Sequence, residues 1–185
     1  MTLSAHTAIV LLLIVIILVG DLIWIGTDPR PRSERLRRKI SLTYPRVTLA
    51  LLPQIMSGLF FPWPDWYGNK LVVPLGAAIF AAGFVLAVWA RFAMGSRWNP
   101  PEQHTEGRQD GLVTGGPFTR SRNPIYLGSL LITIGFGLAV RSYFFFAVIL
   151  LYWSFRKNVV VEEVLLEKAF GTEYLAYKNR VPRFW

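Results

Sequence analysis

The sequence contains no cysteine and only two histidines, His6 and His104, among its 185 residues. Without cysteine the protein cannot form disulfides, zinc–thiolate sites, iron–sulfur clusters or a cysteine nucleophile. Two isolated histidines also argue against a histidine-rich metal centre, so we expect no bound metal. The remaining residues support neither a phosphate-binding loop of the nucleotide-hydrolase kind nor a Ser-His-Asp triad.

Charged residues are scarce as well. They make up 17% of the chain, whereas a soluble domain usually carries about 25%. Hydrophobic residues make up 53% and are gathered into long uncharged runs that a soluble surface could not hide. This composition excludes disorder for most of the chain. It predicts an all-α, integral membrane helical bundle that forms one domain over residues 1–185.

Five runs with little or no charge are candidate membrane helices, for which about 20 mostly apolar residues are needed. They cover residues 8–26, 47–64, 71–90, 123–140 and 142–155. The first run has no preceding Lys or Arg and no following small-residue cleavage site, so we expect a retained helix rather than a signal peptide. The fifth is short, but Arg156 and Lys157 at its end can snorkel and let the helix continue. We predict five spans, three in residues 1–92 and two in residues 93–185, and a cytoplasmic C-terminal helix. Gly171 is a plausible stop for this helix, and residues 173–179 can add one or two more turns.

The formal net charge of +9 is concentrated on one side of this predicted bundle. Eighteen of the twenty Lys and Arg residues follow the first, third and fifth spans. Because basic loops stay in the cytoplasm, this distribution places the N-terminus outside and the C-terminus in the cytoplasm. The aromatic residues lie in the spans rather than among the basic clusters, so we expect a membrane environment and no nucleic-acid partner.

A long connection on the predicted cytoplasmic side, residues 91–122, is rich in Gly, Pro and polar residues. A segment of this length in a compact protein is usually functional. Its glycines let the backbone approach a ligand closely. Asn123 and Pro124 suit the N-cap and first turn of the fourth span, and a helix N-terminus favours an anion such as a carboxylate. A simple membrane-entry turn is the alternative interpretation.

Two adjacent acids, Glu162 and Glu163, follow the fifth span. Charge this close to hydrocarbon is costly, so the pair suggests a site for a cationic ligand. A solvated helix face is the alternative. Only Arg141 and Ser142 separate the fourth and fifth spans, so these spans must form a tight hairpin. The hairpin brings the acids to the same membrane face as the glycine-rich connection.

Other polar and small residues give weaker signals. Asp21 lies near the cytoplasmic end of the first span, and His104 is more simply an ordinary loop residue than a ligand or a base. In the third span, Gly76 and Gly83 indicate close packing against another helix.

Two motifs carry a resemblance to a known family. The first is Leu-Val-Thr-x-Gly-Pro-Phe at 112–118, followed by Arg-Asn-Pro-x-Tyr-x-Gly at 122–128. The second is Glu-Glu-x-x-Leu at 162–166, followed by Phe-Gly-x-x-Tyr-x-x-Tyr at 170–177 and Arg-Val-Pro-Arg at 180–183. In order and spacing they resemble the isoprenylcysteine carboxyl methyltransferase family, a group close to the membrane phospholipid methyltransferases.

The resemblance implies an integral membrane enzyme that uses S-adenosylmethionine without a Rossmann domain. It implies a cytoplasmic cofactor pocket and a lipophilic acceptor, either a small molecule or a lipid-anchored one, that enters from the bilayer. Carried over by position, the cofactor contacts fall on Gln103, Asp110, Gly111, Leu112, Val113, Phe118, Asn123, Pro124, Ile125, Tyr126, Glu162 and its neighbour Glu163.

The chain departs from this family pattern in places. The family often has His at the positions of Asp110 and Asn123, and Tyr at the position of Phe118. The prenylcysteine enzymes place an Arg four residues before the first Glu to hold the substrate carboxylate, and here that position is Asn158. Arg156 lies two residues earlier. We therefore name Arg156 and Asn158 as candidate acceptor-side residues.

The residues themselves agree with such a cofactor. Glu162 or Glu163 can meet one of its cationic groups or a ribose hydroxyl. Backbone donors at 111–113 and at the start of the fourth span can meet its carboxylate or adenine. Since the methyl group is already activated, alignment is the main task, and ordering alone is worth about 7–11 kcal/mol. A phospholipid amine, an isoprenoid acid and a thiol all remain open as acceptors. A non-catalytic membrane scaffold is the main alternative; a small transporter is disfavoured because the spans are poor in ionisable residues.

Overall fold

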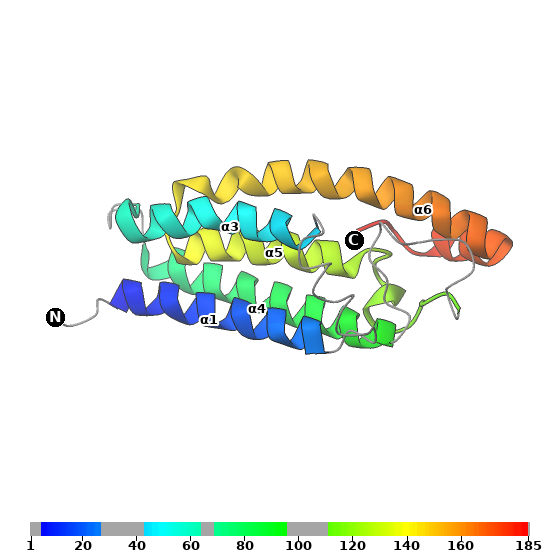
Figure 1. The fold of residues 1–185 in the computed structure, drawn as a ribbon, viewed down its shortest axis with the longest axis horizontal. Coiled ribbons are helices and arrows are strands. Elements are labelled where there is room, and N and C mark those ends of the chain that lie inside the picture. The colour runs from blue at the N-terminus through cyan, green and yellow to red at the C-terminus, as the bar shows by residue number, and fades with distance from the viewer. Residues whose placement is uncertain (1–4, 27–42, 64–68, 96–110, 185) are drawn as a thin grey trace.

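The structure, a computed structural model, describes residues 5–26, 43–63, 69–95 and 111–184. Within these ranges all regular secondary structure is helical, and Figure 1 shows the long helices side by side in an elongated bundle. The helices are α1 (Ala5–Gly26), α3 (Thr43–Phe60), α4 (Asn69–Met94), α5 (Pro124–Ala139) and α6 (Ala147–Arg180), with short 3-10 turns η4 (Gly116–Thr119) and η5 (Tyr143–Phe146).

Helices lie at all five positions predicted for membrane spans. Three segments are long and apolar enough to cross a membrane by length and composition, namely His6–Ile23, Lys70–Met94 and Tyr143–Arg180. The apolar segments Ala50–Phe60 and Pro124–Ala139 are shorter. The helical membrane fold is therefore confirmed in the described part of the chain, whereas the number of five spans stays a prediction.

The outer surface of the bundle is apolar. Leu22 on α1, Leu71 on α4 and Leu150 on α6 are 67%, 78% and 76% exposed. Large exposed apolar patches are rare on soluble monomers and mark surfaces that meet a membrane or a partner. Lipid contact therefore explains the hydrophobic excess that the core alone does not absorb.

The closest helix contact joins α4 and α5, which run antiparallel. Gly76 and Gly83 of α4 pack directly against the backbone of α5 near Gly135 and Gly128, together with the Cβ atoms of two leucine residues. A Cβ atom added to Gly83 would lie 2.7 Å from the Gly128 carbonyl oxygen. In lipid no hydrophobic effect drives helices together, so they associate by close packing. Small residues allow this because they let the helix backbones approach each other. The packing role predicted for Gly76 and Gly83 is confirmed.

The N-terminal helices cover this pair on one side. Val10 and Leu13 of α1 and Leu51 of α3 pack in one buried cluster with Phe80 of α4 and Phe136 of α5. A hydrogen bond between the His6 ring, through Nε2, and the Gly58 carbonyl oxygen at 2.7 Å ties α1 to α3. Helices α1 and α3 thus brace the α4–α5 pair.

The predicted hairpin joins α5 to α6. Arg141 takes a positive φ of 55°, and the Ser142 side chain accepts a hydrogen bond from the backbone N–H of Phe144 at 3.0 Å. Helix α6 then returns along the bundle and projects beyond the other helices (Figure 1). The start of α5 and the later part of α6 consequently meet at the same end of the molecule.

Helix α6 continues well past the fifth predicted span. It has 34 residues and bends at Gly171, where φ is 51° and ψ is −122°. A residue with a Cβ rarely adopts a positive φ, so glycine permits this bend. The sequence named Gly171 as a stop, with one or two further turns over residues 173–179; the structure instead has one helix that bends at Gly171 and runs to Arg180. The bend turns Tyr174 and Tyr177 inward, and both are buried.

Candidate functional site

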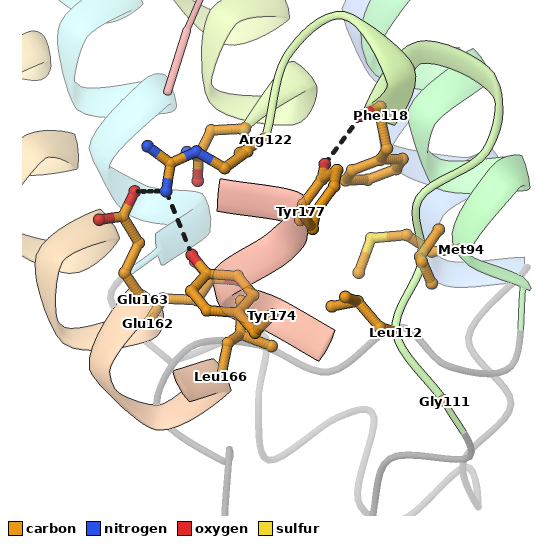
Figure 2. A pocket seen from close by; sticks show the side chains of 12 residues that line it. Met94, Gly111, Leu112, Phe118, Arg122, Glu162, Glu163, Leu166, Tyr174 and Tyr177 are labelled. Carbon is orange, nitrogen blue, oxygen red and sulfur yellow. Dashed lines mark hydrogen bonds and ion pairs between the residues drawn. The ribbon is translucent and has the colours of Figure 1, made fainter. Parts of the chain in front are cut away.

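A pocket lies where α4 ends, α5 begins and α6 bends (Figure 2). Its volume is about 60 Å³, which is below the range of about 300–1,000 Å³ typical of small-molecule sites. It sits at the end of the bundle that the two sequence motifs were predicted to share. The hairpin and the bend at Gly171 bring these motifs together.

Most of the described residues that were predicted to contact a cofactor line this pocket. These are Gly111, Leu112, Val113, Phe118, Asn123, Glu162 and Glu163. Gly111 has a φ of 125°, which explains why glycine is found at this approach to the pocket. Gln103 and Asp110 lie outside the described residues, as does His104.

Three predicted residues stand behind the pocket wall instead. Pro124 opens α5 and is buried, and Ile125 follows it without lining the pocket. Tyr126 is 8% exposed, and its ring centroid lies 4.8 Å from that of Phe155. The Tyr126 hydroxyl donates a hydrogen bond to Glu162 Oε2 at 3.3 Å. Tyr126 therefore orients a pocket residue from behind.

Glu163 is the centre of a buried ion-pair network. Its Oε1 lies 2.9 Å from Arg122 Nη1 and accepts a hydrogen bond from Arg183 Nε at 2.9 Å. Its Oε2 lies 2.6 Å from Arg183 Nη2. The hydrogen bond to Glu163 raises the pKa of Arg183 above its ordinary value. Both carboxylate oxygens of Glu163 are bound by guanidinium groups. Glu163 therefore joins α6 to the loop before α5 and to the C-terminal tail.

Glu162 has a different environment from its neighbour. It lines the pocket and is only partly buried, and the Tyr126 hydroxyl supports its carboxylate. Residues adjacent on a helix point about 100° apart, given 3.6 residues per turn. The sequence left open which of the two acids would face a ligand, and the contacts favour Glu162.

The C-terminal tail closes the site from the other side. The backbone N–H of Arg122 donates to the Pro182 carbonyl oxygen at 3.0 Å, and Asn123 Nδ2 donates to the Arg183 carbonyl oxygen at 2.9 Å. Asn123 occupies the N-cap position of α5, as predicted, but its side chain makes no capping hydrogen bond. The tail backbone accepts that side chain instead.

The segment after the bend in α6 is fastened to the loop before α5. Tyr177 donates a hydrogen bond from its hydroxyl to the Phe118 carbonyl oxygen at 2.8 Å, and Tyr174 accepts one from Arg122 Nη1 at 3.4 Å (Figure 2). The Phe118 ring is buried against this wall. These contacts fix the distance across the pocket.

Several lining residues were not among the predicted contacts. They are Met94, Arg122, Leu166, Tyr174 and Tyr177. Four of them belong to the motifs that carried the family resemblance, so the motif itself was a usable signal. The two tyrosines were noted as part of the second motif but were not named as cofactor contacts. Nothing in the sequence distinguishes Met94.

The two candidate acceptor-side residues lie away from the pocket lining. Arg156 is exposed, and its guanidinium carbon lies 5.6 Å from the centroid of the Trp153 ring. Asn158 is partly buried on α6, one turn before Glu162, and its Nδ2 has no hydrogen-bond partner in the described part of the chain. Asp21, on α1, does not line the pocket either. An acceptor role for Arg156 or Asn158 stays a prediction.

The pocket combines both signs of charge with an apolar wall. Arg122 and Glu162 line it together with Leu112, Leu166 and Met94. Among the residues that the structure describes, no group of three or more His, Asp or Glu side chains is placed to hold a metal ion. The arrangement suits a ligand that carries positive and negative groups beside an aromatic or aliphatic part.

Comparison with known proteins places the chain in a family. A model of the phospholipid methyltransferase family matches residues 71–173, more than half of the chain. The protein-S-isoprenylcysteine O-methyltransferase of Mus musculus is 32% identical over 122 residues, which are 65% of this chain and 43% of that protein. The cobalt-zinc-cadmium resistance protein CzcN of Cupriavidus metallidurans is 27% identical over 136 residues, 71% of this chain and 58% of that protein.

A solved structure shares the fold. The structure of the eukaryotic intramembrane Ras methyltransferase, isoprenylcysteine carboxyl methyltransferase, superimposes with a TM-score of 0.61 at 23% identity and covers 78% of this chain and 52% of that one. The chain spans less than half the length of the mammalian relative that it matches. From its motifs, its fold and the family match, the chain belongs to the phospholipid methyltransferase family and is related to the isoprenylcysteine carboxyl methyltransferases.

Proposed function

We propose that this protein is a membrane methyltransferase that uses S-adenosylmethionine to methylate a lipophilic acceptor. The observation that carries the proposal is the pocket where the two family motifs meet, which Glu162 and Arg122 line together with apolar side chains. Family membership supports the same reading. From the distribution of Lys and Arg, we place the pocket and the C-terminus in the cytoplasm and the N-terminus outside.

The residues present fit this cofactor. S-adenosylmethionine has a cationic sulfur, an ammonium group, a carboxylate and an adenine ring. Glu162 offers a carboxylate to a cationic group or a ribose hydroxyl, and Leu112, Phe118 and Leu166 offer an apolar wall to the ring. Arg122 Nε is buried without a hydrogen-bond partner among the described residues, as expected where a ligand completes a site.

When bound, S-adenosylmethionine supplies a methyl group that its positively charged sulfur already activates. The protein then has to hold donor and acceptor in line and to exclude water. Tyr126 and Phe155 fix Glu162 from behind, while Tyr174 and Tyr177 close the pocket from the far side of the bend. An acceptor with an apolar tail reaches this end from the bilayer along the exposed apolar helix surfaces.

The first test measures the equilibrium binding of S-adenosylmethionine to the full chain, purified in detergent, by isothermal titration calorimetry. We expect saturable binding to one site. Folded protein that does not bind the donor would overturn the proposal. The matched control for the pocket variant Glu162→Gln is Glu167→Gln. Glu167 lies on the same helix but pairs at the surface with Lys178 at 3.1 Å.

Turnover is tested with a donor that carries an isotopically labelled methyl group. The protein is incubated with the donor and a membrane lipid extract, and the products are identified by mass spectrometry. Labelled lipid identifies the acceptor and the accepting atom, whether oxygen, sulfur or nitrogen. Tight donor binding without labelled product from a broad extract would favour the non-catalytic scaffold, consistent with an acceptor side at which Arg156 is turned outward.

A further inference from the structure

Helix α6 is longer than a membrane crossing requires. It has 34 residues, a length of about 51 Å at a rise of about 1.5 Å per residue, whereas the hydrocarbon layer of a bilayer is about 30 Å thick. Its second half lines the pocket on one side, with Glu162, Glu163 and Leu166, and extends beyond the other helices (Figure 1). The opposite side of this half therefore meets water, lipid or another protein.

That opposite side is exposed and apolar. Val160, Val161 and Val164 are 46%, 57% and 50% exposed. Leu150 and Trp153, which are also exposed, belong to the same set. Its members recur at intervals of three, four and seven residues, which is the spacing of a single helix face. The lipid-facing surface of α6 thus continues past residue 155, where the fifth predicted span ends. A contiguous apolar surface of this kind marks contact with a membrane or a partner.

Two lysines lie on the same face. Lys157 precedes Val161 by four residues, Lys168 follows Val164 by four, and both lysines are exposed. Val164 and Lys168 also line a shallow hollow of about 300 Å³ on the helix surface, together with Glu167. An apolar helix face that carries lysines is typical of helices that lie against an anionic membrane surface.

The acids of α6 do not neutralise these two lysines. Glu162 and Glu163 lie on the pocket side of the helix. Glu167, at the edge of the outward face, pairs with Lys178 at 3.1 Å, so its charge is balanced within the protein. Among the residues that the structure describes, no acid forms an ion pair with either lysine of the outward face. The face therefore keeps its positive charge for a partner that is negative.

The level of the pocket indicates that lipid reaches this part of α6. On α4, the exposed apolar side chains run from Leu71 to Phe92, over about 32 Å, which matches the thickness of the hydrocarbon layer. Met94, two residues after Phe92, lines the pocket together with Leu166. The edge of the hydrocarbon layer therefore lies close to the pocket, and Val164 lies on the outer side of the α6 segment that lines it.

From these observations we propose that the outward face of α6, from Lys157 to Lys168, lies on the membrane surface at the pocket end and binds anionic phospholipids. The three valines between the lysines contact the acyl chains, and the lysines contact the phosphate groups. The inference does not depend on the proposed function, because this face is turned away from the pocket. It assigns the second half of α6 to the membrane surface rather than to the aqueous phase.

The experiment measures which lipid lies beside residue 164. The chain has no cysteine, so Val164→Cys carries a single thiol for a fluorescent bimane label. The labelled full chain is placed in phosphatidylcholine nanodiscs that contain the same small fraction of a nitroxide-bearing lipid, either phosphatidylglycerol or phosphatidylcholine. Because the nitroxide quenches bimane only at short range, the loss of fluorescence gives the local concentration of each lipid.

We expect both lipids to quench the label and the anionic lipid to be enriched about fivefold beside it, the factor that one basic residue contributes near anionic lipid. Combining Lys157→Gln with Lys168→Gln should remove this preference. Lys70→Gln is the matched control, because it makes the same change of charge at an exposed lysine at the start of α4. It should leave the preference unchanged. All three lysines are exposed, so these variants should fold.

The proposal fails if neither lipid quenches the label at Val164→Cys while both quench it at Val85→Cys, on an exposed part of α4. The face then meets water or a second copy of the chain, and size-exclusion chromatography in detergent distinguishes these cases. Equal quenching by the two lipids would also overturn it, as would a preference that survives in the folded double lysine variant. None of these results involves the methyl donor, so the proposed function is tested separately.

Discussion

The body of the bundle and its pocket end are held together by different kinds of interaction. In its body, α4 and α5 meet through glycines, which bring the two backbones into close contact. At the pocket end, one buried carboxylate, that of Glu163, joins the loop before α5, helix α6 and the C-terminal tail. Lipid is as apolar as a leucine side chain, so helices in a membrane associate by close fit and by hydrogen bonding. Steric fit builds the scaffold here, and charge builds the site.

The largest effect is expected in the body of the bundle. A Cβ atom added to Gly135 would meet the backbone nitrogen of Phe80 and the carbonyl oxygen of Gly76. Gly135→Leu therefore requires the α4 and α5 backbones to separate, and we expect little or no folded protein by size-exclusion chromatography in detergent. The control is Gly26→Ala, because nothing lies within 4 Å of the Cβ position of Gly26. A normally folded Gly135→Leu would show that the glycine contacts are dispensable.

The second largest effect is expected at the Glu163 carboxylate, at the pocket end of the bundle. Glu163→Gln leaves two arginines without their charged partner. Removing one member of a buried pair costs about 3–5 kcal/mol, and we expect the lower end because Arg183 is partly exposed. The loss is measured as a lower thermal unfolding temperature in detergent. The corresponding change Glu167→Gln breaks only the surface pair with Lys178 and should cost less than about 1 kcal/mol. Equal losses in the two variants would contradict a structural role for Glu163.

The adjacent acid should give the reverse result. Glu162→Gln should weaken S-adenosylmethionine binding by about 10–100-fold, because a hydrogen bond to a charged group is lost. Its unfolding temperature should stay close to that of the wild type, since the Glu162 side chain is only partly buried at the pocket. Calorimetry and thermal unfolding on the same samples separate the two properties. If Glu162→Gln unfolds the protein and Glu163→Gln loses only affinity, the roles of the two acids are exchanged.

The smallest effect is expected at Arg156. Its side chain is exposed and lies over Trp153, a contact worth about 0.5–1 kcal/mol at exposed sites. Arg156→Gln should therefore leave donor affinity and stability nearly unchanged. Once an acceptor is identified, its KM in Arg156→Gln and in Asn158→Ala tests the predicted acceptor-side role. A raised acceptor KM in Arg156→Gln alone would show that this arginine turns inward when the acceptor binds.

Much of the fold followed from hydrophobic runs. A stretch of apolar residues commits the backbone to helix in lipid, because only a helix satisfies its own hydrogen bonds there. The positions of α1, α4 and α5, the hairpin before α6 and the packing of Gly76 could all be predicted in this way. The bend at Gly171 could not, because glycine both ends helices and permits a turn within them. Whether the helix ends or bends at this glycine depends on the contacts that the segment after Gly171 makes with the loop before α5.

The candidate site could be predicted only in part, because motifs identify residues but not the segments that lie opposite them. The motifs located the loop from Gly111 to Phe118 and the acids on α6. The motifs did not say that Asn123 would hold the tail or that Arg156 would face outward, because these outcomes depend on which segments lie opposite each side chain.

The sequence by itself determined that this is a helical membrane protein, where its helices run and which family it belongs to, since hydropathy and motif spacing are properties of the chain alone. Only the tertiary structure decided that, of two acids that both line the pocket, Glu163 is bound by Arg122 and Arg183 and Glu162 by the Tyr126 hydroxyl. The physical reason is that two neighbouring carboxylates are chemically identical until packing gives each its own partners.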